Sequence, residues 1–263
     1  MAVASYPAVC AAFFDHLRDA PSRWLLLDYD GTLAPFTPDR KHAVPYHGFP
    51  ELVSKISRTG TRVIFVSGRP AYELVSLCGI HPHPEIWGSH GREHLLADGS
   101  YLINPPSPEQ QQALRSLARS LEESGLASRT EIKPGGLAVH WRGLARDERE
   151  PIEAEVGSRF RAAVNLHGLE LLAFDGGLEL HASGRNKGDA VSAILAEAGE
   201  GVAAAYLGDD QTDEHAFRAI KGRGLAILVG LVPRPTMADT WLRPPDEVAR
   251  FLSDWLRACG AGE

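Results

Sequence analysis

A short apolar run that ends in two carboxylates is the feature that most constrains this chain. Residues 24–27 are all apolar and lead directly into Asp28; Asp30 follows, and Gly31 turns the chain. So short an apolar run, ended by turn residues, is typical of a buried strand in a parallel sheet. Because ligands bind beyond the carboxyl ends of such strands, Asp28 and Asp30 are predicted to lie at a ligand site.

The close spacing of these two carboxylates allows two interpretations. Residues two apart on a strand point to the same side, and neighbouring carboxylates repel each other unless one is protonated or a cation lies between them. Mg2+ prefers oxygen ligands, so Asp28 and Asp30 are compatible with a metal site. The alternative is a strand that merely ends in an acidic turn, and this stretch taken alone leaves both interpretations open.

Strands and helices alternate over most of the chain. Beside the strand at 24–28, buried strands are expected at 61–66, 85–87, 202–207 and 224–229, and helices at 8–19, 51–59, 71–77, 187–198, 213–220 and 245–258. This alternation with short turns predicts an α/β protein whose core is a doubly wound, Rossmann-like parallel sheet.

A proline-rich segment at 104–108 interrupts this pattern and is typical of a linker. Beyond it, each of two expected helices is followed by two expected strands: helix 107–124 with strands 129–133 and 137–142, then helix 147–165 with strands 169–174 and 177–181. Two helix-strand-strand units predict a small α+β domain over 106–181. It would be inserted into a core formed by residues 1–105 and 182–263.

Polar residues capable of chemistry end several of the predicted strands. Ser67 follows the strand at 61–66, Asp209 and Asp213 follow the strand at 202–207, and Lys187 opens the helix between them. In a parallel sheet these strand ends meet at one edge. Two acidic clusters there could share one Mg2+, while Ser67 and Lys187 hold phosphoryl oxygens. One carboxylate is then available to attack phosphorus. Ser67 taken alone is also explained as an ordinary helix N-cap.

Composition excludes several classes of protein. The 263 residues carry a net charge of −7, which argues against a nucleic-acid partner. No stretch approaches the length of a membrane span, so no membrane partner is expected. The three cysteines form no paired pattern, and the first residues have no signal-peptide pattern. We therefore expect a cytoplasmic protein.

The motifs resemble, in order, those of the haloacid dehalogenase superfamily of phosphatases. The matching segments are Asp28 to Thr32, Ser67, Lys187-Gly188 and Gly208 to Glu214. The insert is similar to the C2-type cap of that superfamily. More specifically, Gly88-x-His90-Gly91-x-Glu93, Lys133-Pro134, His140-x-Arg142 and the two acidic motifs resemble those of trehalose-6-phosphate phosphatases.

The resemblance implies a role for each matching residue of the core. Asp28 would be the nucleophile, and Asp30 would protonate the leaving oxygen and later activate water. Ser67 and Lys187 would hold the phosphate. Mg2+ would be bound by Asp28, by Asp30 through its backbone carbonyl, and by Asp209, with Asp213 binding or supporting it; whether Asp210 or Asp213 has the more direct contact is left open.

The resemblance also implies which residues contact the sugar. These are Glu93, Lys133, His140, Arg142 and Glu179, and we further assign Thr32, Gly68 and His90 to substrate binding. Three other residues are interpreted as structural: Arg69 near the site but outside it, Trp141 within the inserted domain, and Cys78 in the core.

These implications together predict a Mg2+-dependent phosphatase. It would hydrolyse trehalose 6-phosphate to trehalose and phosphate through an aspartyl-phosphate. One alternative is a phosphatase of another glycosyl phosphate, such as glucosylglycerol phosphate or mannosylglycerate phosphate. Another is a non-catalytic sugar-phosphate-binding partner of a synthase. We expect a monomer whose ligand is a small sugar phosphate, and leave a synthase partner open.

Overall fold

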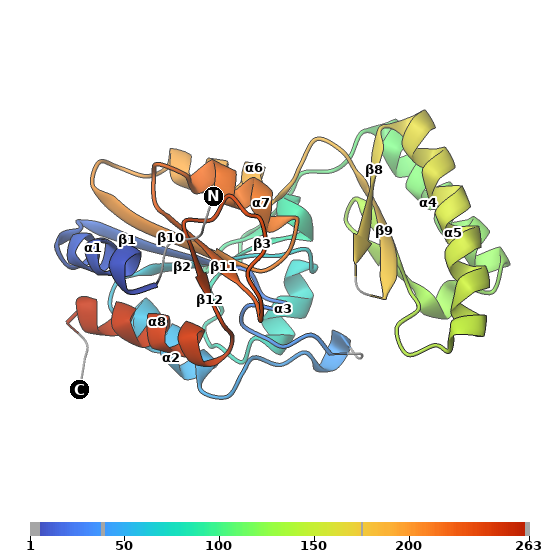
Figure 1. Cartoon of the computed structure of the whole chain (residues 1–263). Coiled ribbons are helices and arrows are strands. Elements are labelled where there is room, and N and C mark those ends of the chain that lie inside the picture. The colour runs from blue at the N-terminus through green and yellow to red at the C-terminus, as the bar shows by residue number, and fades with distance from the viewer. Residues whose placement is uncertain (1–5, 38–39, 175, 261–263) are drawn as a thin grey trace. The chain divides into compact units, whose positions relative to one another are not determined.

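Two compact units make up the chain, and one is inserted in the other. The computed structural model describes residues 6–37, 40–174 and 176–260 (Figure 1). The first unit comprises Met1–Leu102 and Asn186–Glu263, and the second comprises Ile103–Arg185. Within the described ranges, no helix has both the length and the apolar character needed to cross a membrane.

An eight-stranded sheet forms the centre of the first unit, in the order β12-β11-β10-β1-β2-β3-β4-β5. Its strands are β1 (Ser22–Leu27), β2 (Arg62–Val66), β3 (Glu85–Gly88), β4 (Glu93–Leu95), β5 (Tyr101–Ile103), β10 (Val202–Gly208), β11 (Leu225–Val229) and β12 (Thr240–Leu242). Neighbours from β12 to β3 pair in parallel, and β4 runs antiparallel to β3. The predicted α/β fold with a parallel core is therefore confirmed, with β12 as an additional edge strand.

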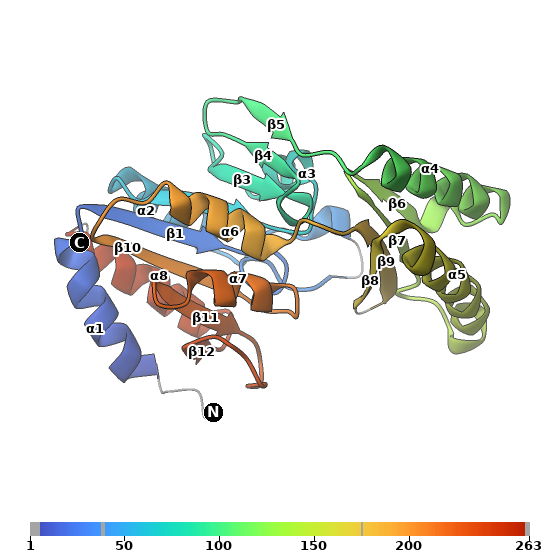
Figure 2. The ribbon, with the colours of Figure 1, turned by 90° about the horizontal axis from the view of Figure 1, so that it is seen from above.

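Helices cover both faces of this sheet (Figures 1 and 2). One face packs against α1 (Tyr6–Asp19), α2 (Phe49–Arg58), α3 (Ala71–Leu77) and α8 (Asp246–Ala258), and the other against α6 (Lys187–Ala196) and α7 (Asp213–Ile220). Strand alternation divides β1 between them, because Leu25 and Leu27 enter the first layer while Trp24 and Leu26 enter the second. Short 3-10 helices lie at Arg40–His42 and Ser89–Gly91.

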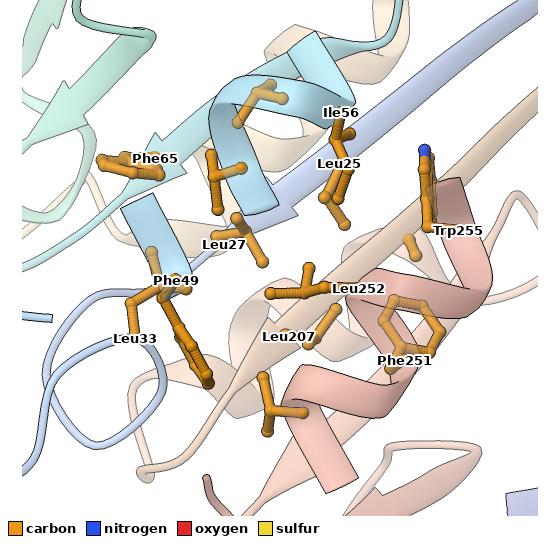
Figure 3. Close-up of a cluster of buried hydrophobic side chains, with 14 of the residues drawn as sticks. Leu25, Leu27, Leu33, Phe49, Ile56, Phe65, Leu207, Phe251, Leu252 and Trp255 are labelled. Atoms are coloured by element: carbon orange, nitrogen blue, oxygen red, sulfur yellow. The ribbon is translucent and has the colours of Figure 1, made fainter. Parts of the chain in front are cut away.

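The larger of the two apolar layers combines aliphatic side chains with several aromatic ones (Figure 3). Phe251 and Trp255 of α8 pack with their ring centroids 6.0 Å apart. The buried Trp255 indole donates to Thr61 Oγ1 at 3.1 Å, which satisfies its polar atom. Cys78 is fully buried in the same layer, which confirms its predicted place in the core.

The second unit packs two helices on a four-stranded antiparallel sheet of order β6-β7-β9-β8. Its elements are α4 (Pro108–Glu123), a 3-10 turn (Ala127–Arg129), β6 (Thr130–Lys133), β7 (Gly136–His140), α5 (Arg146–His167), β8 (Leu169–Phe174) and β9 (Gly177–Ala182). Ser107 caps α4 by accepting from the Gln110 N–H at 3.2 Å. Trp141 is buried in this unit's core, as predicted.

Candidate active site

The carboxyl ends of three adjacent strands converge at the centre of the first unit. Leu27 of β1 lies opposite Leu207 of β10 on one side and Phe65 of β2 on the other. Asp28 continues this pairing, because its N–H donates to Leu207 O at 2.8 Å. The sheet thus brings together the acidic segments that follow β1 and β10, as predicted for strand ends in a parallel sheet.

A buried lysine joins the two acidic segments. Lys187 opens α6, whose N-cap residue Asn186 accepts from two backbone N–H groups of the first turn. The Lys187 Nζ atom lies 2.9 Å from Asp28 Oδ1 and 2.8 Å from Asp213 Oδ1. All three charged side chains are almost completely buried. One buried cation therefore bridges two buried carboxylates.

Asp213 accepts hydrogen bonds on both of its oxygens. Oδ1 accepts from Lys187 Nζ at 2.8 Å and from the Tyr206 hydroxyl at 2.5 Å. Oδ2 accepts from the N–H groups of Asp209 and Asp210, each at 2.9 Å. A carboxylate offers about four acceptor positions. The four donors therefore fill the acceptor positions of Asp213, which holds Lys187, Tyr206 and the backbone of Asp209 and Asp210 in place. Tyr206 belongs to none of the sequence motifs.

Burial and the excess of negative charge shift the pKa values of the site. Burial raises the pKa of Asp28 to about 8, against the opposing effect of Lys187 and with a contribution from Asp213. Burial and then the charge of Asp28 also raise the pKa of Asp209. The pKa of Lys187 is raised because its two carboxylate partners outweigh its own desolvation. The site is therefore short of positive charge.

This deficit and the type of donors fit a hard cation. One carboxylate oxygen from each of Asp28, Asp209 and Asp213 lies within 4.8 Å of the others. Asp209 also closely approaches Gly31, where an added Cβ would lie 2.1 Å from Asp209 Oδ2 and where φ is +77°. Only glycine suits this turn. Because Asp213 is occupied by protein donors, Asp28 and Asp209 are the better placed to hold Mg2+.

The segment after β2 contacts the loop that carries His90. Ser67 Oγ accepts from the Arg69 N–H at 3.2 Å, and the His90 N–H donates to Ser67 O at 3.0 Å. A Cβ added to Gly68 would lie 2.7 Å from His90 Cε1, so the imidazole packs directly on this glycine. Thr32 is completely buried, and its hydroxyl has no hydrogen-bond partner in the described part of the chain.

The loop that carries His90 has an unusual backbone. Ser89 and His90 have φ values of +47° and +56°, which are left-handed for two successive non-glycine residues. Glu93 holds this turn by accepting from Ser89 Oγ at 2.5 Å and from the Tyr101 hydroxyl at 2.9 Å. Glu93, expected to contact the sugar, is 2% exposed within this network.

Arg69, which sequence analysis had placed outside the site, contacts a predicted catalytic residue. Its Nε atom lies 2.6 Å from Asp30 Oδ2, and its Nη2 atom lies 2.7 Å from Asp30 Oδ1. The Arg69 side chain is 2% exposed, and its guanidinium also lies over the Tyr29 ring. Arg69, interpreted from the sequence as structural and near the site but outside it, therefore directly contacts a predicted site residue. Its position two residues after Ser67 was the available signal.

The remaining predicted residues lie in the second unit, with Lys133, His140 and Glu179 on its sheet and Arg142 in the turn after β7. Lys133 Nζ and Glu179 Oε2 form a buried ion pair at 2.5 Å. His140 Nε2 lies 2.9 Å from Glu131 Oε2, and Arg142 lies against Gly176. Leu137, Val139 and Leu180 enter the core between the sheet and the helices. By strand alternation, Glu179 and His140 project from the opposite face.

Comparisons with known proteins give a consistent result. A family model described as trehalose-phosphatase matches residues 26–243. A trehalose 6-phosphate phosphatase of Zea mays is 29% identical, over 97% of this chain and 76% of that protein.

Two solved structures from Candida albicans share the fold. The trehalose-6-phosphate phosphatase C-terminal domain has a TM-score of 0.76 at 19% identity, and covers 99% of each chain. The C-terminal domain of a trehalose synthase regulatory protein has a TM-score of 0.71 at 13% identity, over 96% of this chain and 99% of that one. Because one is named a phosphatase and the other a regulatory protein, the fold alone does not separate these functions.

Proposed function

This chain belongs to the trehalose-phosphatase family, as its motifs predicted, and is a phosphomonoester hydrolase; we propose that it hydrolyses trehalose 6-phosphate to trehalose and phosphate with Mg2+. The observation that carries the proposal is the buried contact of Lys187 Nζ with Asp28 Oδ1 at 2.9 Å. It places a cation beside a carboxylate at the strand end where the family motif has its nucleophile. This arrangement suits phosphoryl transfer, which needs positioning and charge neutralisation.

In the proposed first step, an Asp28 carboxylate oxygen attacks phosphorus. The phosphorus–oxygen bond to the sugar breaks as the acyl-phosphate bond forms, and Asp30 gives its proton to the leaving sugar oxygen. Lys187 and the Ser67 hydroxyl hold phosphoryl oxygens during this transfer. Bound Mg2+, held by Asp28 and Asp209, would neutralise charge between the phosphoryl group and the carboxylates.

In the second step, Asp30 takes a proton from water. The resulting hydroxide attacks phosphorus, phosphate leaves, and Asp28 is regenerated as a carboxylate. Asp30 ends protonated, ready to act again as an acid. Asp213 keeps Lys187 oriented throughout, because the lysine remains hydrogen-bonded to it at 2.8 Å.

We further propose that the inserted unit acts as a cap domain that recognises the sugar. A disaccharide presents many hydroxyl groups and needs directed polar partners. Lys133, Glu179, His140 and Arg142 supply such groups, and His140 and Glu179 project from the sheet face that α4 and α5 leave uncovered. Thr32, Gly68, His90 and Glu93, which the sequence also assigns to substrate binding, lie in the first unit.

Phosphate release from a substrate panel tests the proposal. The panel contains trehalose 6-phosphate, glucose 6-phosphate and glucosylglycerol phosphate, each with Mg2+ and with EDTA. We expect the highest kcat/KM for trehalose 6-phosphate, no turnover in EDTA, and no turnover after Asp28→Asn. A preference for another glycosyl phosphate would refute the substrate, and activity in EDTA would refute the metal requirement. A chain that binds trehalose 6-phosphate without hydrolysing it would be a sugar-phosphate-binding protein instead.

A further inference from the structure

An arginine outside every motif reaches the acidic segment that follows β10. Arg234 lies in the loop 230–239 between β11 and β12. Its Nη2 atom donates to Asp210 O at 2.6 Å and to Asp209 O at 3.3 Å. Its side chain is 23% exposed. One guanidinium thus holds the carbonyl groups of two successive acidic residues.

The same two residues are also held through their N–H groups. The N–H groups of Asp209 and Asp210 both donate to Asp213 Oδ2 at 2.9 Å. Both polar backbone groups of each residue are therefore bonded, the N–H to an anion and the carbonyl to a cation. Backbone groups engaged in this way cannot rotate without losing a charge-assisted hydrogen bond. The direction of the Asp209 side chain follows from that backbone.

Arg234 is itself fixed by the start of α7. Its Nη1 atom is hydrogen-bonded to Glu214 Oε1, and the other oxygen of Glu214 accepts from the Met237 N–H at 2.8 Å. Glu214 is 7% exposed and directly follows Asp213. The loop 230–239 therefore contacts the acidic segment and the start of α7 through the Arg234 guanidinium and the Glu214 carboxylate.

We propose that Arg234 is a positioning residue for the cation site, and that through it the loop 230–239 sets the affinity for Mg2+. This inference rests on the proposed function, because it takes Asp209 as a metal ligand. Arg234 does not touch the cation. It holds the backbone from which Asp209 projects, and partners that orient metal ligands commonly change metal affinity by about 10–100-fold.

The test compares four variants of the full chain, stripped of metal. Arg234→Met removes the donors but keeps an unbranched side chain, and Arg234→Lys restores one cation without the planar fork. Glu214→Gln removes the charge that holds the Arg234 guanidinium. Arg218→Met is the matched control, because Arg218 is an exposed arginine on α7, the helix that also carries Glu214. The first measurement is the increase in Tm as Mg2+ is added, which reports binding without turnover.

We expect the apparent Kd for Mg2+ to rise about 10–100-fold in Arg234→Met. We expect a smaller rise in Arg234→Lys and Glu214→Gln, and none in Arg218→Met. The second measurement is kcat with trehalose 6-phosphate, which should recover at saturating Mg2+. A purely structural role would lower Tm without metal and leave the Mg2+ affinity unchanged, which would overturn the inference. Should Arg234→Met not fold, the same comparison is made with Arg234→Lys.

The two proposals fail in different ways. Wild-type protein whose Tm and turnover do not respond to Mg2+ would overturn the metal dependence, and this inference with it. Wild-type protein that responds to Mg2+, together with Arg234 variants that match Arg218→Met, would overturn the inference alone.

Discussion

Arg69 holds both carboxylate oxygens of Asp30, with Nε 2.6 Å from Oδ2 and Nη2 2.7 Å from Oδ1. This two-armed contact ties the proposed acid-base residue to the segment that directly follows Ser67. To give a proton to a sugar oxygen, one Asp30 oxygen has to leave the guanidinium. Arg69 therefore orients Asp30 and also competes with the substrate for it.

Replacing Arg69 should affect substrates according to their leaving group. Arg69→Met removes both guanidinium contacts to the Asp30 carboxylate. We therefore expect kcat for trehalose 6-phosphate to fall by about 10²-fold, within the range of a misplaced acid-base group. p-Nitrophenyl phosphate has a leaving group that needs little protonation, and its turnover should fall much less. Steady-state kinetics with both substrates measures the ratio.

Asp30→Asn is the control for this ratio, because it removes the acid itself. It should also lower kcat more for trehalose 6-phosphate than for p-nitrophenyl phosphate. Equal losses for the two substrates in Arg69→Met would mean that Arg69 supports the fold and does not position Asp30.

Tyr206→Phe should weaken the charged cluster without changing its shape. The hydroxyl donates to Asp213 Oδ1 at 2.5 Å, and Lys187 remains as the other donor to that oxygen. We expect the free energy of unfolding to fall by about 1–3 kcal/mol, the cost of removing one partner of a buried polar group. Chemical denaturation of the metal-free protein measures this. An unchanged free energy would show that the hydroxyl contributes nothing to the cluster.

The sequence predicted the convergence of strand ends but not the contacts that hold them. The apolar pattern of the strands predicts a parallel sheet. In such a sheet the carboxyl ends of the strands lie at one edge, which brings Asp28, Lys187 and Asp213 together. Arg234 and Tyr206 reach the site through long side chains from positions whose local patterns carry no signal of it. Strand β12 was missed because three residues are too few for a periodicity to show.

The packing of His90 on Gly68 can be tested by a double-mutant cycle. Gly68→Ala places a methyl group 2.7 Å from His90 Cε1, which is too close for an undisturbed imidazole. We expect Gly68→Ala to destabilise the protein, and His90→Ala to relieve part of that cost in the double variant. The coupling free energy should be about 0.5–3 kcal/mol, as for residues in contact. Chemical denaturation of all four proteins gives this value, and additivity of the two single changes would contradict it.

Glu85 should make the first unit less stable in acid. Burial would raise its pKa, but hydrogen bonds from His94 and Trp87 and the charge of Arg62 outweigh burial, so the pKa of Glu85 lies below its ordinary value. The folded protein therefore binds this proton less readily than the unfolded chain. The stabilisation is present above about pH 4.5, the ordinary value, and is lost as the pH falls through the lowered pKa.

Glu85→Gln removes that carboxylate and should lower the free energy of unfolding by about 1.5–3 kcal/mol at neutral pH, the worth of a hydrogen bond to a charged group. As the pH falls from 4.5 through the lowered pKa of Glu85, the difference from wild type should shrink, because protonation then neutralises the wild-type carboxylate as well. Glu197→Gln is the matched control: Glu197 pairs with the same Arg62, but its side chain is 52% exposed. This control should cost at most about 1 kcal/mol. Chemical denaturation across the acid range separates the outcomes, since a Glu85→Gln deficit that stays constant with pH would show that the carboxylate does not titrate as argued.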